Sequence, residues 1–144
     1  MANIVKNTTI DFKNLLLKNG SCAFVPSGDS MWPIIKNRGQ SVIITKKTNR
    51  LKKYDVGFYL RDNGAYVLHR VIEVTDSGYV MCGDAQFMRE QVNEEQVFGV
   101  LTGFYVGEKF VDVNCKKYLR KVKRWYRCTL WRKVLFKLHR LKRK

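Results

Sequence analysis

The chain has 144 residues, of which 28 are Lys or Arg and 12 are Asp or Glu, so its formal net charge is +16. A chain of this length accommodates one domain with a short appendage. Its content of 45% hydrophobic and 12% aromatic residues excludes a wholly disordered chain. With only 2 Pro and 10 Gly, a collagen-like chain is excluded too.

The charge is distributed unevenly. Residues 1–115 contain 14 bases and all 12 acids, whereas residues 116–144 contain the other 14 bases and no acid. We therefore expect a nearly neutral domain over 1–115 and a basic tail over 116–144. No apolar run reaches the roughly 18–20 residues of a membrane-spanning helix, and the N-terminus lacks the pattern of a secretory signal. These features predict a cytoplasmic protein.

The four cysteines, Cys22, Cys82, Cys115 and Cys128, form no CxxC pair and no cluster with histidine. In a cytoplasmic chain this pattern favours reduced, mostly buried thiols over a disulfide or a metal site. The sequence implies no metal and no organic cofactor.

The first predicted element is a helix. Thr8 followed by Asp11 at the capping-box spacing opens it, and Gly20 ends it. Short runs rich in β-branched and aromatic residues then predict strands. The predicted strands are Cys22–Val25, Ser41–Thr45, Val56–Leu60, Ala65–Val74, Gly78–Cys82 and Val97–Val106.

Two turn signals separate strands that are neighbours in the sequence. Asp62-Asn63-Gly64 is a strong hairpin signal, and Asp76-Ser77-Gly78 indicates a second turn. Strands joined in this way favour a mainly β fold with an antiparallel coiled sheet or barrel.

The tail has a helical period. Apolar residues recur in steps of three or four with bases between them, which predicts one basic amphipathic helix. Four interpretations stay open: packing on the sheet, binding to an anionic membrane surface, binding to nucleic acid, and binding to an acidic peptide or protein. The repeating positions are Leu119, Val122, Tyr126, Leu130, Val134, Leu138 and Leu141.

Three segments carry candidate chemistry. The first is Pro26-Ser27-Gly28-Asp29-Ser30-Met31-Trp32-Pro33, a constrained turn around a serine. The second is Tyr66-Val67-Leu68-His69-Arg70-Val71-Ile72, an apolar strand interrupted by His69. The third is Met81-Cys82-Gly83-Asp84-Ala85-Gln86, with Glu90 six residues after Asp84. Each segment alone is more often structural than catalytic.

In this order, Gly-Asp-Ser-Met-x-Pro, Val-Leu-His-Arg-Val and Gly-Asp together resemble the signal peptidase I family. Tyr54-Asp55-Val56-Gly57-Phe58 is similar to a further segment of that family, and the resemblance spans Ala23 to Phe104. The serine-containing segment is also similar to the LexA/UmuD-type autoproteases. A histidine in place of the usual lysine is typical of the endoplasmic-reticulum and archaeal branch of signal peptidases.

The resemblance implies a serine endopeptidase that cleaves a leader or signal-like peptide after small residues. Ser30 would be the nucleophile and His69 the general base. Either Asp84 or Glu90 would orient the imidazole, and Asp84 is the slightly favoured acid because it matches the Gly-Asp segment of the family. The backbone N–H of Ser30 would stabilise the oxyanion, with Ser27 as a second donor.

The chain departs from the family at several positions. Gly28 stands where many bacterial members have a serine, and Ala85-Gln86 replaces the usual asparagines. The N-terminal membrane anchor of the family is also missing, and the basic tail is a candidate substitute for it at the membrane. The alternative function is therefore a non-catalytic module with a peptidase fold that binds a membrane surface or nucleic acid through its tail.

Overall fold

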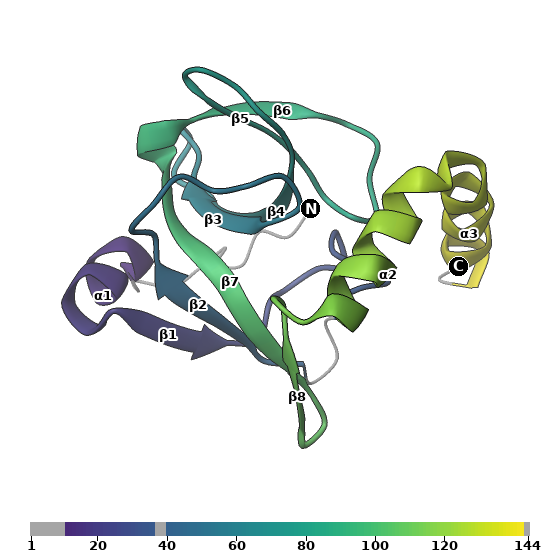
Figure 1. The fold of residues 1–144 in the computed structure, drawn as a ribbon, viewed down its shortest axis with the longest axis horizontal. Helices are drawn as coiled ribbons and strands as arrows, with labels where there is room; N and C mark the ends of the chain where they lie inside the picture. Colours follow the sequence, from purple (N-terminus) through teal and green to yellow (C-terminus); the bar gives the residue numbers. More distant parts are fainter. Residues whose placement is uncertain (1–10, 37–39, 143–144) are drawn as a thin grey trace.

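The computed structural model describes residues 11–36 and 40–142. These residues form an antiparallel sheet of eight strands that does not close into a barrel, together with three α-helices (Figure 1). The prediction of a mainly β, antiparallel fold is confirmed. The helices are α1 (Phe12–Asn19), α2 (Lys116–Arg127) and α3 (Thr129–Lys142), with a 3₁₀ turn η1 (Glu94–Gln96). The strands are β1 (Ser21–Phe24), β2 (Val42–Lys46), β3 (Val56–Leu60), β4 (Tyr66–Val74), β5 (Gly78–Cys82), β6 (Glu90–Asn93), β7 (Val97–Val106) and β8 (Lys109–Asp112).

Helix α1 begins one residue after Asp11, whose carboxylate accepts a hydrogen bond from the N–H of Asn14 at 3.1 Å. Asp11 is therefore the N-cap residue and not the third residue of a box opened by Thr8, which lies outside the described residues. Gly20 ends the helix with a positive φ of 82°, as predicted.

The sheet follows the order β1-β2-β7-β3-β4-β5-β6, and β8 pairs with β7. Both predicted hairpins are confirmed. The N–H of Arg61 donates to the carbonyl of Ala65 at 2.9 Å across the first turn, and the N–H of Thr75 donates to the carbonyl of Gly78 at 2.9 Å across the second. Gly64 has a φ of 87°, which suits glycine in a tight turn.

Two strands, β6 and β8, were not predicted. Strand β6 has a single buried residue, Val92, between polar neighbours. Strand β8 has no fully buried residue, and among the described strands it pairs with β7 alone. Neither shows the apolar pattern that marks a strand in a single sequence.

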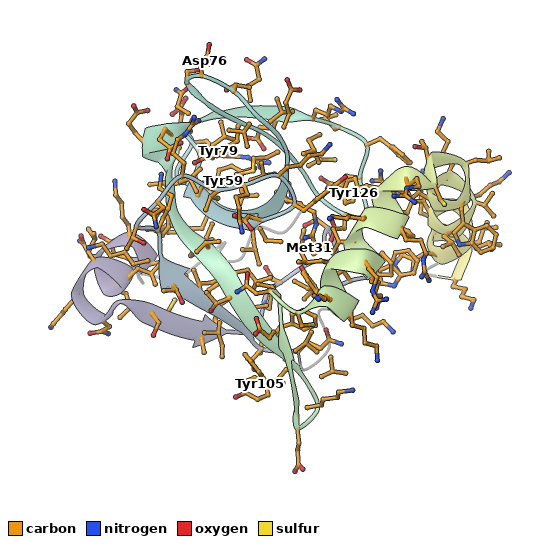
Figure 2. The ribbon with its side chains drawn as sticks, in the orientation of Figure 1. Met31, Tyr59, Asp76, Tyr79, Tyr105 and Tyr126 are labelled. Atoms are coloured by element: carbon orange, nitrogen blue, oxygen red, sulfur yellow. The ribbon has the colours of Figure 1, made fainter. Side chains whose placement is uncertain are left out.

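The curved sheet buries apolar side chains on both faces, so neighbouring residues of β3 and β4 belong to different cores. The larger cluster lies under α1 and α2 and includes Phe58 and Leu68. The smaller one includes Tyr59 and Val67, which directly follow and precede those residues. Figure 2 shows Tyr59 and Tyr79 of the smaller cluster close together beneath the β4–β5 turn that carries Asp76.

The tail forms two helices where one was predicted. The chain turns at Cys128, whose ψ of 69° lies outside the helical range. Helix α2 contributes Tyr118 and Val122 to the larger core cluster. Leu130 and Leu138 of α3, predicted to share a face with Val122, are instead exposed. Helix α3 lies at the opposite end of the molecule from α1 (Figure 1).

All four cysteines are free, but only Cys82 is buried; Cys115 and Cys128 are exposed. The prediction of mostly buried thiols is therefore wrong. No helix within the described residues is both long and apolar enough to cross a membrane.

Candidate active site

His69 lies in β4 opposite Gly57 of β3, and only 3% of its surface is exposed. Because side chains alternate between the faces of a strand, His69 shares its face with Val67 and Val71 of the smaller core cluster. Along the strand, the imidazole is therefore flanked by apolar side chains on its own face of the sheet.

The Tyr59 hydroxyl connects His69 to an acid. It donates to Oε1 of Glu90 at 2.7 Å and lies 3.3 Å from Nδ1 of His69. A hydroxyl carries one proton. Since that proton points to Glu90, the Tyr59 oxygen accepts from the imidazole, and Nδ1 carries the ring hydrogen. The other ring nitrogen, Nε2, is then unprotonated.

Glu90 is held in its charged form. Arg61 donates to both of its carboxylate oxygens, at 2.8 and 2.9 Å. Burial acts to raise the pKa of Glu90, but the hydrogen bonds from Arg61 and Tyr59 outweigh it and lower the pKa. A negative charge is therefore present one hydroxyl away from the imidazole at neutral pH.

The protonation state of His69 also follows from its surroundings. Burial lowers its pKa to about 4, although the charge of Glu90 acts in the opposite direction. The ring is thus neutral at pH 7, and within the described residues Nε2 has no hydrogen-bond partner. A neutral imidazole with an available lone pair on Nε2 is the form that a general base requires.

Ser30 lies in the turn after β1 and is 2% exposed. Gly28 has a φ of 80°, a conformation that favours glycine. Two backbone hydrogen bonds fix the turn: the N–H of Trp32 donates to the carbonyl of Asp29 at 3.0 Å, and the N–H of Ala85 donates to the carbonyl of Ser30 at 2.8 Å. The second bond ties the serine turn to the segment after β5.

Segment 83–87 brings the serine turn and the histidine to the same region. A Cβ on Gly83 would lie 2.7 Å from the Ser30 carbonyl oxygen, so glycine permits this approach. Gln86 and Phe87 line a groove of about 580 Å³ together with His69. No hydrogen bond joins Ser30 to His69 among the described residues, because Nε2 is unpartnered and Nδ1 faces Tyr59.

Asp84 lies on the other side of β4. Its carboxylate accepts two hydrogen bonds from Arg70, at 2.8 and 2.7 Å, and both side chains are fully buried. The Tyr126 hydroxyl donates to the same carboxylate. Arg70 directly follows His69 in the strand, so the two side chains point to opposite faces. Of the two acids that the sequence left open, Glu90 is the one connected to His69.

Ser27, the second oxyanion donor expected from the resemblance, is exposed at the start of the turn in which Ser30 is buried. Sequence reasoning missed three members of the site: Tyr59, Arg61 and Arg70. Only Arg70 had a usable signal, since a guanidinium inside an apolar strand requires a buried partner.

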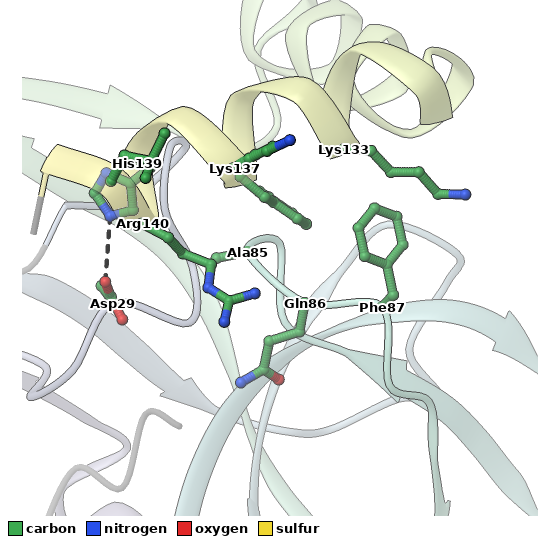
Figure 3. Close-up of a pocket in the computed structure, with 10 residues that line it drawn as sticks. Asp29, Ala85, Gln86, Phe87, Lys133, Lys137, His139 and Arg140 are labelled. Atoms are coloured by element: carbon green, nitrogen blue, oxygen red, sulfur yellow. Dashed lines mark hydrogen bonds and ion pairs between the residues drawn. The ribbon is translucent and has the colours of Figure 1, made fainter. Parts of the chain in front are cut away.

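Helix α3 covers the serine turn. Nε2 of His139 lies 3.3 Å from Oδ2 of Asp29, and the His139 ring stacks on Trp32 with centroids 4.1 Å apart. A cavity of about 610 Å³ lies between α3 and segment 85–87. Figure 3 shows the Asp29–His139 contact at one end of it, with the Arg140 side chain extending from α3 toward Gln86.

A second attachment of α3 is made by Arg132, which is only 6% exposed. Its guanidinium donates to the carbonyl of Gln86 at 3.0 Å. It also lies 4.5 Å from the ring centroid of Tyr126 and 4.7 Å from that of Phe87. Cation–π contacts of this kind are favourable when they are shielded from water, so α3 is held firmly against segment 85–87.

Comparisons of the chain with protein-family models, curated proteins and solved structures found no match in any of the three.

Proposed function

We propose that this chain is a serine endopeptidase that cleaves a leader or signal-like peptide by Ser-His catalysis, with a fold of the signal peptidase/LexA type. The observation that carries the proposal is the state of His69. Its ring is buried and neutral, Nδ1 faces the Tyr59–Glu90 pair, and Nε2 is a buried nitrogen without a hydrogen-bond partner among the described residues. The residue also lines the groove formed with Gln86 and Phe87. The motif resemblance around Ser30, His69 and Asp84 supports the same reading.

In the proposed reaction, Ser30 Oγ attacks the peptide carbonyl carbon while Nε2 of His69 takes the hydroxyl proton. The C–N bond then breaks, and the imidazolium returns the proton to the leaving amine. Water then attacks the acyl carbon and gives a proton to Nε2. As the acyl C–Oγ bond breaks, the imidazolium passes this proton to Ser30 Oγ, and the acid product leaves.

The polar groups near His69 favour the charged intermediate of this cycle. The imidazolium formed during attack gains from the nearby carboxylate of Glu90, with Tyr59 between the two. The backbone N–H of Ser30 is the proposed main donor to the oxyanion. Because Ser27 is exposed, its hydroxyl is the less suitable second donor.

Asp84 has a supporting role in the proposal. Its pairing with Arg70 and the hydrogen bond from Trp125 Nε1 to its backbone carbonyl at 2.9 Å hold the start of segment 84–87 against α2. That segment carries the N–H that binds the Ser30 carbonyl. Asp84 therefore positions the serine turn and does not touch the reacting atoms.

The test is cleavage of a peptide library that has small residues before the scissile bond, read by mass spectrometry. We expect Ser30→Ala and His69→Ala each to lower turnover by about 1,000-fold or more. The matched control is Ser77→Ala, which alters an exposed serine in the β4–β5 turn and should leave turnover unchanged. Turnover that persists in Ser30→Ala would refute the proposal. A folded wild-type protein without any turnover would favour the non-catalytic binding module instead.

A further inference from the structure

Helix α3 has an apolar face that nothing in the described chain covers. Positions separated by four, four and three residues fall on one side of a helix. This side lies opposite the α3 residues that contact the rest of the domain. We call it the outer stripe. Its members, with exposed fractions from 42% to 78%, are Leu130, Trp131, Val134, Leu138 and Leu141, of which Leu141 also lines the rim of the cavity between α3 and segment 85–87.

The inner face of α3 is already occupied. Arg132 and His139 contact the serine turn and segment 85–87, and the Phe136 ring lies 5.6 Å from that of Trp125. The outer stripe is therefore not a core face that has been left slightly open. Five large apolar side chains exposed on one helix are unusual for a surface that meets only water.

The charge around the stripe indicates what covers it. Lys137 and Lys142 fall on its two sides by helical spacing, and both are exposed. Residues 116–144 contain 14 bases and no acid, and the bases of α2 between residues 116 and 127 are all exposed as well. Such a surface attracts polyanions. The apolar stripe further indicates a partner that also offers a hydrocarbon region to cover the exposed side chains.

We propose that the outer stripe of α3 docks on an anionic lipid surface. Leucines, valine and tryptophan would enter the boundary between headgroups and acyl chains, while lysines and arginines meet the phosphates. The helix has 14 residues, about 21 Å of length, so it lies along the surface and does not span it. A nucleic acid would satisfy the bases but would leave the leucines in water.

Docking in this way has a geometric consequence. The serine turn contacts the inner face of the same helix through Asp29 and Trp32. The candidate active site therefore lies about one helix diameter, roughly 10 Å, from the lipid surface.

The test is binding of the full chain to vesicles, read by co-sedimentation. Wild type should bind vesicles of 30% phosphatidylglycerol in phosphatidylcholine well and pure phosphatidylcholine weakly, and added salt should weaken the first interaction. The triple variant Leu130→Ser, Val134→Ser, Leu138→Ser should lose about tenfold or more in affinity. These side chains are exposed, so the variant should unfold at the wild-type denaturant concentration. The matched control, Leu17→Ser, alters a 52% exposed leucine of α1 at the other end of the molecule and should bind like wild type.

A second readout locates the contact. Tryptophan fluorescence should shift to the blue when vesicles are added, and Trp131→Phe should remove most of that shift. Unchanged binding by the triple variant, or no preference for phosphatidylglycerol, would overturn the proposal, and so would binding to duplex DNA without binding to vesicles. Because Ser30→Ala should bind vesicles like wild type, failure of the peptidase proposal would leave this one standing.

Discussion

The Asp84–Arg70 pair predicts that Asp84 stabilises the fold and does not orient His69. Both side chains are fully buried and share two hydrogen bonds. Burial acts to lower the pKa of Arg70, but the charge of Asp84 outweighs it and holds the pKa well above its ordinary value. Because a guanidinium is not deprotonated in proteins, Asp84→Asn leaves Arg70 as a cation that is buried without a counter-charge.

Removing one partner of a buried ion pair typically costs about 3–5 kcal/mol. Two other acceptors of Arg70 stay in place, the Tyr54 carbonyl at 2.8 Å and the Tyr118 hydroxyl at 3.1 Å. We therefore expect about 3 kcal/mol, the lower end of the range. That is a large part of the roughly 5–15 kcal/mol that stabilises a typical domain.

The measurement is urea unfolding followed by circular dichroism. Asp76→Asn is the matched control, because Asp76 is exposed at the β4–β5 turn (Figure 2) and should change the unfolding free energy by less than about 0.5 kcal/mol. If Asp84→Asn does not fold, the double variant Arg70→Met, Asp84→Leu should fold, since it removes both charges together. A cost below about 1 kcal/mol with a strong loss of peptidase activity would refute this reasoning and return Asp84 to the role of orienting His69.

Two further predictions concern His69. Tyr59→Phe removes the hydroxyl between His69 and Glu90, and loss of that hydrogen bond should lower kcat about 10- to 100-fold with little change in KM. The control is Tyr79→Phe, which removes another buried hydroxyl of the same cluster and should have little effect on kcat. The pKa of His69 falls from its ordinary 6.5 to about 4 on folding, so the unfolded chain binds more protons between these values and stability drops as the pH falls through this window. Between pH 7 and pH 5, the free energy of unfolding should lose about 2 kcal/mol of His69 contribution. Urea unfolding of wild type and His69→Asn at both pH values measures this contribution as the difference in their pH dependence. Equal pH dependence of the two proteins would contradict the burial argument.

The strands that could be predicted are those with enough buried residues to show a pattern. Val56–Leu60, Gly78–Cys82 and Val97–Val106 were predicted with the bounds that the structure has, because each is dense in buried apolar side chains. Strand β6 was missed because Val92 alone supports it. This omission affected the site, since β6 is the strand that carries Glu90 to Tyr59.

For a related reason, the sequence could not decide whether Asp84 or Glu90 is the acid connected to His69. Strand alternation already separates His69 from Arg70, but it does not say to which face the chain returns after β5. The structure resolves this through contacts of long sequence separation: Tyr126 and Trp125 hold Asp84 on the α2 side. Glu90, six residues later, reaches the opposite face.

The break at Cys128 changes how the tail has to be studied. The repeat from Leu119 to Leu141 suggests one continuous apolar face, yet Val122 is fully buried and Leu138 is half exposed. Deleting residues 116–144 would take Tyr118 and Val122 out of the main core cluster and Trp125 away from the Asp84 carbonyl. A truncated protein that failed to bind lipid would therefore show only that the domain had been damaged.

Substitutions confined to the outer stripe separate the packing role of the tail from its proposed lipid-binding role, because the inner face of α3 keeps its contacts with Asp29 and Gln86. The same logic predicts that peptide cleavage in detergent-free solution survives the stripe variants, while cleavage of a substrate presented on vesicles does not.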